Sequence, residues 1–302
     1  MRLGNFKETL KTAEIEYTEN VPMSLYTTFK VGGNADVLVK PKTQSELETA
    51  LLAARENGVP VFILGNGSNL LVSDKGIEGA VVSMLSLNFV KVSGNEIVCG
   101  AGARLSAVCI AARDAGLTGL EFAYGIPGTV GGAFYMNAGA YGGEIANVAI
   151  SAECIDADGK PCCLSAAEME FGYRTSVFKK GGLVITAVKL RLENGKREEI
   201  TAAMNGYMKR RAEKQPLEYP SAGSTFKRPT GYYAGALIEG SGLKGASVGG
   251  AQVSEKHAGF IINRGNATAD DVCALIEKVK NTVLAAEGVT LEPEVLFVGR
   301  KE

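Results

Sequence analysis

The sequence predicts an α+β protein with more than one domain, and three observations carry this prediction. Early in the chain, TTFKVGGNADVLVKP, a helical pattern and VPVFILG follow one another in a strand–helix–strand order. Short β runs then recur, as AVVSML, EIVCGAGA and LVITAVKLRL. A charged helical stretch begins at Glu198, where the composition shifts. We therefore place a domain boundary near residue 197.

The first half of the chain contains well-marked local signals. Thr43 is expected to cap a helix from about residue 44 to 57, which Gly58 ends before VPVFILG forms a buried strand. A second helix is expected from about residue 105 to 115, and Asp158-Gly159 closes a β-hairpin.

The last third of the chain carries a further helical signature. A charged helix runs to about Lys214, and a glycine-rich helix lies around residues 232–239. Thr268 and Asp271 form a capping box for a final long helix that Gly288 stops. Before this helix, GFIIN is expected to form a strand. After the helix, LEPEVLFVGR is expected to form the C-terminal strand.

Composition excludes several classes of function. The chain has 302 residues, 46% hydrophobic and 22% charged, and a net charge of −1, which offers no field for nucleic acid or anionic lipid. We find neither a signal peptide nor an apolar run long enough to span a membrane, so we expect a cytoplasmic protein. The six cysteines include no CxxC and only one histidine accompanies them, so buried thiols are favoured over disulfides or a metal site.

Two glycine-rich stretches are candidates for ligand contact. Residues 65–70, GNGSNL, suit either an anion-binding nest or a plain β-turn, and the sequence does not separate the two. Residues 121–145, EFAYGIPGTVGGAFYMNAGAYGGEI, are expected to form a long ordered loop around a flat cofactor or a pyrophosphate. Two other glycine patterns are decoys, because Leu105 replaces the third glycine of a dinucleotide fingerprint and Ser241 replaces the lysine of a P-loop.

Three polar residues stand in apolar or glycine-rich settings. Ser224 lies in YPSAGSTFK, beside Lys227 and Arg228; Arg174 lies in GYRTS, and Glu294 in LEPEV. Singly, each is better explained as a turn or surface residue. Together with the two glycine-rich stretches they indicate redox chemistry on an anionic substrate, with a hydroxyl as proton donor beside positive charge.

In this order, GNGSNLLVSD, YGIPGTVGGAFYMNAGAYGGEI, GYRTSVFK, YPSAGSTFKRP and LEPEV resemble the UDP-N-acetylenolpyruvoylglucosamine reductase family of peptidoglycan synthesis. The resemblance extends from about Thr27 to Gly299. It implies a two-subdomain FAD-binding fold of the vanillyl-alcohol oxidase (PCMH) type and a C-terminal α+β substrate-binding domain. The expected limits are 1–80 and 81–197 for the two FAD subdomains and 198–291 for the substrate domain, with strand 292–302 returning to the second subdomain.

The resemblance also implies the cofactors and the residues that hold them. FAD is expected to bind without a covalent link, and NADPH to act as co-substrate. The expected cofactor-binding residues are Gly65, Asn66, Gly67, Ser68, Asn69, Tyr124, Gly125, Pro127, Gly128, Thr129, Gly131, Gly132 and Tyr173. The expected contacts to the sugar nucleotide are Lys214, Lys227, Arg228, Lys256 and His257. For His257, a histidine at the edge of a helix or loop without a role in binding is an equally good interpretation.

The implied reaction assigns a role to each catalytic residue. Flavin N5 would deliver hydride to C3 of the enolpyruvyl group, and Ser224 would protonate C2. Arg174 would bind the substrate carboxylate through two hydrogen bonds, and Glu294 would donate a hydrogen bond if desolvation raises its pKa. Only ENGK follows the strand that ends at Leu192, which is typical of the short-loop (type II) members. We expect a monomer that binds small molecules only.

Two alternatives remain at this point. One is an FAD-dependent oxidase of the same fold, in which FAD is often attached covalently to a histidine or cysteine. The other is a sugar-nucleotide-binding module without redox activity, which would be colourless when purified.

Overall fold

The computed structural model describes residues 2–300, which form two compact units. Unit 1 comprises residues up to 19, residues 37–66 and residues 79–211; unit 2 comprises residues 20–36, residues 67–78 and residues from 212 on. The chain passes from one unit to the other within β1 (Tyr17–Pro22), β2 (Asn34–Val39), β5 (Ile77–Ser83) and α5 (Arg197–Lys214). The three-domain division expected from the sequence stays a prediction.

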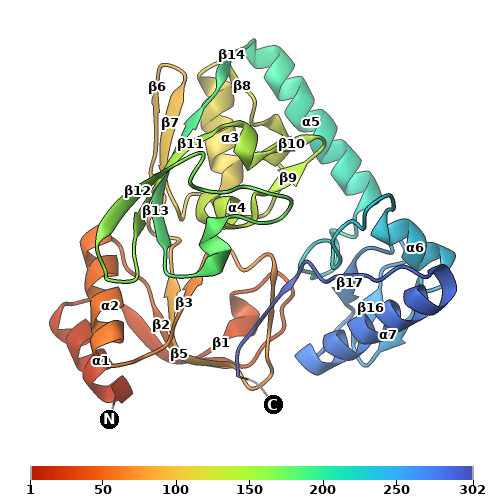
Figure 1. Cartoon of the computed structure of the whole chain (residues 1–302), viewed down its shortest axis with the longest axis horizontal. Helices are drawn as coiled ribbons and strands as arrows, with labels where there is room; N and C mark the ends of the chain where they lie inside the picture. Colours follow the sequence, from red (N-terminus) through yellow and green to blue (C-terminus); the bar gives the residue numbers. More distant parts are fainter. Residues whose placement is uncertain (1, 301–302) are drawn as a thin grey trace. The chain divides into compact units, whose positions relative to one another are not determined.

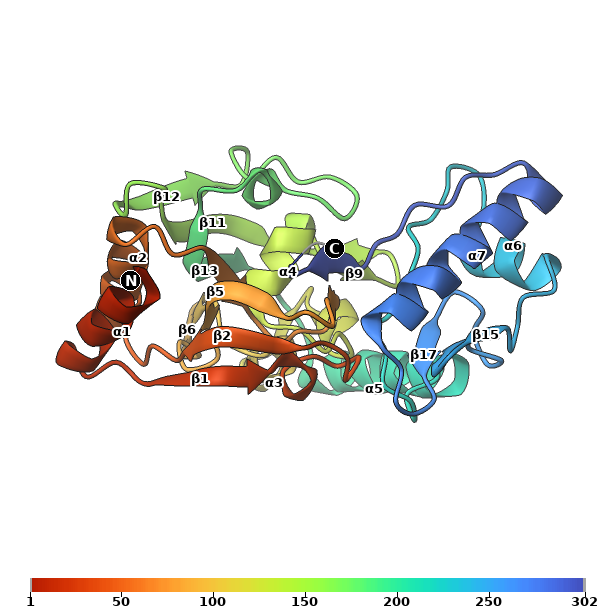
Figure 2. The same ribbon diagram turned by 90° about the horizontal axis from the view of Figure 1, so that it is seen from below.

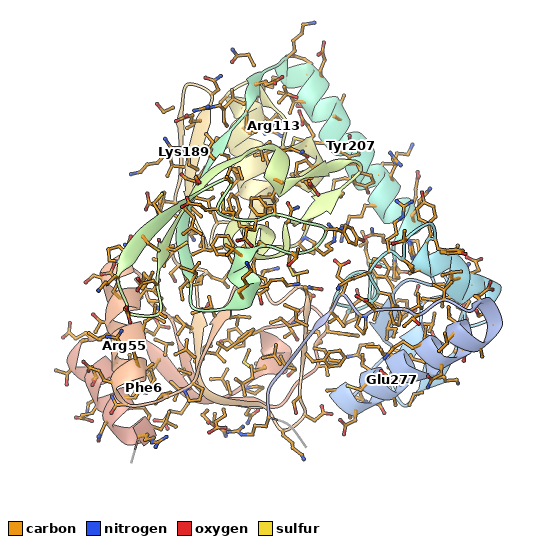
Figure 3. All side chains as sticks on the ribbon, in the orientation of Figure 1. Phe6, Arg55, Arg113, Lys189, Tyr207 and Glu277 are labelled. Carbon is orange, nitrogen blue, oxygen red and sulfur yellow. The ribbon has the colours of Figure 1, made fainter. Side chains whose placement is uncertain are left out.

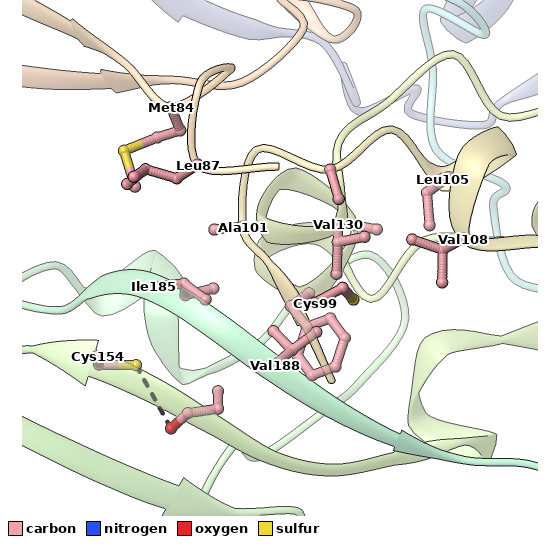
Figure 4. Packing of buried hydrophobic residues seen from close by; sticks show 14 of the residues in the cluster. Met84, Leu87, Cys99, Ala101, Leu105, Val108, Val130, Cys154, Ile185 and Val188 are labelled. Carbon is pink, nitrogen blue, oxygen red and sulfur yellow. Dashed lines mark hydrogen bonds between the residues drawn. The ribbon is translucent and has the colours of Figure 1, made fainter. Parts of the chain in front are cut away.

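A five-stranded sheet is the largest element of unit 1 (Figure 1). Its order is β12 (Pro161–Ser165), β11 (Ala149–Ile155), β13 (Val184–Arg191), β7 (Glu96–Gly100) and β6 (Val90–Ser93), and each neighbouring pair is antiparallel. Two helices, α3 (Leu105–Asp114) and α4 (Val130–Met136), pack against this sheet. Figure 4 shows the resulting core, in which Cys99 and Val188 of the sheet lie near Val130 of α4.

A second sheet has the order β1-β2-β5-β3, with β3 (Val61–Leu64) parallel to β5. In unit 1, α1 (Arg2–Thr12) and α2 (Gln44–Glu56) lie side by side, as Figure 2 also shows. The expectation that β3 is a buried strand is wrong. It lies at the edge of the sheet, where Val61 is 38% exposed and only Leu64 is buried.

The other local signals of unit 1 are confirmed. The Thr43 hydroxyl accepts a hydrogen bond from the backbone N–H of Glu46 at 3.1 Å, so it caps α2 as the sequence predicts. Helix α3 ends at Asp114, and Gly116 follows in the left-handed region at φ +68°. Strands β11 and β12 form the hairpin that Asp158-Gly159 closes.

Unit 2 has its own core around α7 (Ala269–Glu287). This helix packs against β15 (Ser247–Val248) and β16 (Ala251–Val253) of the three-stranded sheet that β17 (Ile261–Asn263) completes. The capping box predicted at Thr268 and Asp271 is confirmed, and Gly288 ends α7 in the left-handed region. Helix α6 (Ala234–Gly240) also packs on α7.

The C-terminal strand does not pair as expected. Strand β18 (Leu296–Val298) pairs in parallel with β4 (Leu70–Val72), and both belong to unit 2. The sequence analysis expected it to return to the 81–197 region. The correction arises because strand pairing is set by distant hydrogen-bond partners, which a local pattern cannot identify.

The remaining elements are short. They are η1 (Met23–Leu25), β8 (Leu117–Thr118), η2 (Glu121–Ala123), β9 (Gly139–Ala140), β10 (Gly143–Glu144), η3 (Ile145–Asn147), η4 (Val177–Lys180) and β14 (Glu193–Asn194).

Asp74 provides a test of how unit 2 is held together. Its carboxylate accepts hydrogen bonds from the backbone N–H groups of Ala269 at 2.9 Å and Asp270 at 3.1 Å, at the start of α7. Since these N–H groups have no partner within the helix, Asp74→Ala should lower the free energy of unfolding by about 1 to 2 kcal/mol. Urea unfolding followed by circular dichroism measures the change. Lys278→Ala, on the exposed face of α7, is the control, and an equal effect of both variants would contradict the assignment.

Candidate functional site

The two glycine-rich stretches meet in unit 1. The Asn66 side-chain N–H donates to the backbone carbonyl of Pro127 at 2.6 Å. A Cβ atom on Gly65 would lie only 2.5 Å from the Thr129 hydroxyl oxygen, so Gly65 leaves room for that hydroxyl. The expected cofactor residues Gly65, Asn66, Pro127 and Thr129 are thus neighbours, although about sixty positions separate them in the sequence.

Residues 121–145 are not the long loop that the sequence analysis expected. They contain α4, which Thr129 caps by accepting a hydrogen bond from the Gly132 N–H at 3.4 Å. Gly131 lies so close to Ala101 that its Cβ would be 2.9 Å from the Ala101 Cβ. The helix forms despite its two glycines because Val130 and Phe134 are completely buried in the core.

The other part of the first stretch belongs to unit 2. Gly67 has φ +62°, and a Cβ there would lie 2.1 Å from the Tyr26 carbonyl oxygen, so no other residue fits without a backbone shift. The Asn69 side chain donates to the Glu294 carbonyl at 3.2 Å. Ser68, which stands between Gly67 and Asn69 in the sequence, is half-buried. Whether residues 65–69 bind phosphate stays a prediction.

Arg174 sits at the tip of a tight turn that α4 anchors. Gly172 and Thr175 exchange both backbone hydrogen bonds, which leaves only Tyr173 and Arg174 in the turn. Arg174 has φ +55°, an uncommon conformation for a residue with a side chain and one that recurs at functional sites. The guanidinium donates to the Gly139 carbonyl at 2.9 Å and lies over the Tyr173 ring.

The base of this turn is fixed by buried polar groups. Asn137, fully buried, donates to the Gly172 carbonyl at 3.0 Å, and Ser176 donates to the Tyr135 carbonyl at 2.8 Å. Because both contacts come from the end of α4 or its last turn, the Arg174 turn is tied to the same helix that begins at Thr129.

The segments that carry Ser224 and Glu294 pair with each other in unit 2, although 70 positions separate the two residues. The backbone N–H of Glu294 donates to the Thr225 carbonyl at 2.8 Å, and the N–H of Lys227 donates to the Glu292 carbonyl at 2.8 Å. Phe226 and Pro293 form the bridge between these two bonds. The Ser224 side chain is exposed, while Thr225 and Phe226 are each 3% exposed. A buried anchor therefore presents an accessible hydroxyl next to the segment of Glu294.

The expected substrate-binding cations have different surroundings in unit 2. Lys227 pairs with Glu292 at 3.0 Å, and Lys256 donates to the Ala212 carbonyl at 2.8 Å. Arg228 stacks on the Tyr233 ring at 4.0 Å, and Lys214 is exposed at the end of α5. These contacts with the protein do not test a role in substrate binding, which stays a prediction.

His257 lies close to Ser224 in unit 2. Its ring makes an edge contact with Phe260, with ring centroids 5.0 Å apart. Burial lowers its pKa below the ordinary value of 6.5, so the imidazole is neutral at neutral pH.

Arg211 is a candidate that the sequence analysis missed. Its methylene groups lie against Gly125, where a Cβ would be 3.2 Å from the Arg211 Cδ. Burial lowers the pKa of its guanidinium, and we find no hydrogen-bond or ion-pair partner for it within residues 2–300. A partly desolvated cation without a carboxylate is suited to an anionic ligand. Within the charged pattern of α5, Arg211 resembles its exposed neighbours. Its burial could not be predicted, because it depends on Gly125, some 85 positions earlier.

Tyr141 lies near this cation. Its ring stacks on that of Tyr207 with centroids 4.4 Å apart, and Tyr207 projects from α5 (Figure 3). Arg210 lies 5.0 Å from the centre of the Tyr141 ring. The hairpin β9–β10, which carries Tyr141, is therefore attached to α5.

Two other classes of site find no support within residues 2–300. No group of three or more histidine, cysteine, aspartate or glutamate side chains could hold a metal ion there. None of the helices in this range is both long and apolar enough to cross a membrane.

Comparison with known proteins agrees with this arrangement. A family model described as an FAD binding domain matches residues 35–165, and one described as the C-terminal domain of UDP-N-acetylenolpyruvoylglucosamine reductase matches residues 215–298. A UDP-N-acetylenolpyruvoylglucosamine reductase of Caldanaerobacter subterraneus subsp. tengcongensis is 52% identical over 99% of this chain and 98% of its own. The chain belongs to the UDP-N-acetylenolpyruvoylglucosamine reductase family. A relative of the same name from Clostridium novyi is 51% identical over 95% of this chain and 93% of its own.

A solved structure supports the fold of the family. The UDP-N-acetylenolpyruvylglucosamine reductase of Thermus caldophilus is 38% identical, covers 94% of this chain and 98% of its own, and has a TM-score of 0.81. The fold class expected from the sequence, an FAD-binding fold with a C-terminal α+β domain, is confirmed. The chain is an FAD-containing oxidoreductase of this reductase family.

The residues of unit 1 fit an FAD of this family. The guanidinium of Arg211, which has no hydrogen-bond or ion-pair partner within residues 2–300, suits its negative charge. A Cβ atom on Gly132 would have only the Thr129 hydroxyl within 4 Å, so little of the described protein fills the space at that glycine. Of the first stretch, Gly65 lies against Thr129 and Asn66 against Pro127, as described above.

Gly65 provides a test of this assignment. Gly65→Ala would force the Thr129 hydroxyl away from its place, and we expect FAD to bind about tenfold or more weakly, equivalent to about 1.4 kcal/mol or more. Gly206→Ala is the matched control: nothing lies within 4 Å of its Cβ, so a helical alanine there should retain FAD and add up to about 1 kcal/mol of stability. Flavin absorbance per protein, measured during dilution, gives the affinity. Equal FAD retention by both variants would contradict the role of Gly65.

Proposed function

We propose that this chain reduces the enolpyruvyl group of UDP-N-acetylglucosamine enolpyruvate to a lactyl ether, giving UDP-N-acetylmuramate for peptidoglycan synthesis. The observation that carries the proposal is the exposed hydroxyl of Ser224 beside the Glu294 segment, in a chain 52% identical to a reductase of that name. Bound FAD would accept a hydride from NADPH and supply it to C3 of the enolpyruvyl group. The protein's task is then to bind the carboxylate, control the developing charge and deliver a proton to C2.

Ser224 is the proposed proton donor. The hydroxyl is exposed, and its neighbours Ala222 and Gly223 are small, so a substrate can approach it closely. The only acceptor that it contacts among the described residues is the Phe226 carbonyl, at 3.4 Å. This contact is long enough for the hydroxyl to be redirected when a substrate binds.

Arg174 is the proposed ligand of the substrate carboxylate. A guanidinium can bind a carboxylate through two parallel hydrogen bonds, and it keeps its charge at every physiological pH. The left-handed backbone at Arg174 fixes the direction in which the side chain leaves the turn. We propose that four cations bind the diphosphate of the sugar nucleotide: Lys214, Lys227, Arg228 and Lys256.

The FAD-dependent oxidase with covalently attached flavin is the weaker alternative. Cys99 and Cys109 are 0% and 1% exposed, and burial raises the pKa of each thiol to about 12, which disfavours the reactive thiolate.

The experiment that tests the proposed function is anaerobic. The yellow protein should bleach on addition of NADPH and regain its colour on addition of UDP-N-acetylglucosamine enolpyruvate. Bleaching without recovery would contradict the proposal, and flavin that remains attached after denaturation would favour the oxidase.

Ser224→Ala separates the proton donor from the flavin chemistry. Because a positioned general acid contributes about 10²- to 10⁴-fold, reoxidation of the reduced enzyme by the enolpyruvyl substrate should slow by that factor. Reduction of the flavin by NADPH needs no proton from Ser224 and should keep its rate. Stopped-flow absorbance measures the two half-reactions separately. Equal losses in both would remove Ser224 from the role of proton donor.

We propose that Glu294 is protonated and donates a hydrogen bond to the substrate, and Glu294→Gln tests this protonation state. If the carboxyl group acts as a hydrogen-bond donor, glutamine can replace it, and the reoxidation rate should stay within about tenfold of the wild type. Glu294→Ala removes the donor and should cost about 10²- to 10³-fold. Reoxidation that is equally slow in both variants would show that the negative charge, and not a donated hydrogen bond, is required.

A further inference from the structure

Gly259 lies between the side chains of His257 and Ser224. A Cβ atom at Gly259 would be 3.0 Å from Cε1 and 3.2 Å from Nδ1 of His257, and 3.5 Å from the Ser224 hydroxyl oxygen. The imidazole and the hydroxyl thus approach the same face of one glycine. Any side chain at this position would displace one of them.

A chain of hydrogen bonds joins His257 to the residue after Ser224. The N–H of Gly259 donates to Nδ1 of His257 at 3.1 Å, and the carbonyl of Gly259 accepts from the N–H of Thr225 at 2.8 Å. The Thr225 hydroxyl in turn accepts from the N–H of Ile261 at 3.0 Å. Because the Thr225 carbonyl also accepts from Glu294, every backbone polar group of Thr225 is used, and its position depends on Gly259.

The bond to Gly259 fixes the protonation of the imidazole. A nitrogen that accepts an N–H carries no proton, so the neutral ring holds its proton on Nε2. Burial is the main cause of the lowered pKa of His257, and Lys244 and Lys214 lower it further. A hydrogen bond to its own backbone and the charge of Glu239 of α6 act in the opposite direction. The accepting form is therefore present at neutral pH and is lost as the pH falls through the lowered pKa.

We propose that His257 is a positioning residue for Ser224: its unprotonated Nδ1 holds Gly259, and Gly259 holds Thr225 and thereby the Ser224 hydroxyl. This inference rests on the proposed function, in which Ser224 protonates the substrate. It gives His257 a role that needs no direct contact with the sugar nucleotide. Protonation of Nδ1 would place two N–H donors against each other and release Gly259.

Two substitutions distinguish the effect of the hydrogen-bond acceptor at His257 from the effect of the size of its ring. In His257→Asn, the side-chain oxygen can accept from the N–H two residues later, as asparagine does in many turns, but it cannot titrate. His257→Ala removes the acceptor. Reoxidation of NADPH-reduced enzyme by saturating UDP-N-acetylglucosamine enolpyruvate is measured for each, over roughly pH 5 to 8, where histidines titrate.

His257→Ala should slow reoxidation by about tenfold or more, since small misplacements of a reacting group can cost up to about 10²-fold. His257→Asn should react within about threefold of the wild type, which is a fraction of one kcal/mol. The wild-type rate should fall at acid pH, and His257→Asn should lack this fall. Val279→Ala, on α7 in the hydrophobic core of unit 2, is the control for general loosening of unit 2 and should keep the wild-type rate.

Several results would overturn the inference while leaving the proposed function intact. They are a His257→Ala rate equal to the wild type, a His257→Asn rate as slow as His257→Ala, an acid fall that persists in His257→Asn, and a Val279→Ala loss as large as that of His257→Ala. Weaker binding of the sugar nucleotide by His257→Ala with an unchanged rate at saturation would assign a direct contact instead. If the wild-type enzyme is not reoxidised at all, the proposed function fails, and this inference fails with it.

Discussion

The short pairing between residues 225–227 and residues 292–294 is the constraint on which the proposed chemistry depends. Two backbone hydrogen bonds, each 2.8 Å long, surround the bridge between Phe226 and Pro293. Buried Phe226 and Val295 anchor the two segments in the core of unit 2, and the Asn69 side chain holds the Glu294 carbonyl from another segment. A serine is a weak acid, so its usefulness depends on where it is held. This pairing sets its position next to the segment of Glu294.

Unit 1 uses the same principle with other residues. Helix α4 begins at Thr129, beside Gly65, and ends at Asn137, whose side chain binds the Arg174 turn. A single short helix therefore links the expected cofactor residues to the expected carboxylate ligand. Its two early glycines weaken an isolated helix by about 1 kcal/mol each, and burial of Val130 and Phe134 compensates for this. The left-handed conformations of Asn137 and Arg174 are maintained by these tertiary contacts.

The sequence predicted the features that depend on neighbouring residues. The caps at Thr43 and Thr268, the stops at Gly116 and Gly288 and the β11–β12 hairpin each need only a few adjacent positions. Helix α4 was missed because glycine lowers helix propensity and its stability comes from distant packing. The pairing of β18 with β4 and the burial of Arg211 against Gly125 were missed because each joins segments far apart in the chain. The motifs that resemble the family indicated Ser224, Arg174 and Glu294, but only the structure shows that the segments of Ser224 and Glu294 are paired.

A double-mutant cycle tests the central claim, that Ser224 and Glu294 act as one pair on a single proton transfer. The rate of flavin reoxidation by the enolpyruvyl substrate is measured for the wild type, Ser224→Ala, Glu294→Ala and the double variant. Residues that act as a unit show non-additive effects, so the double variant should be hardly slower than the slower single variant. Losses that multiply, as for two independent sites, would contradict the account.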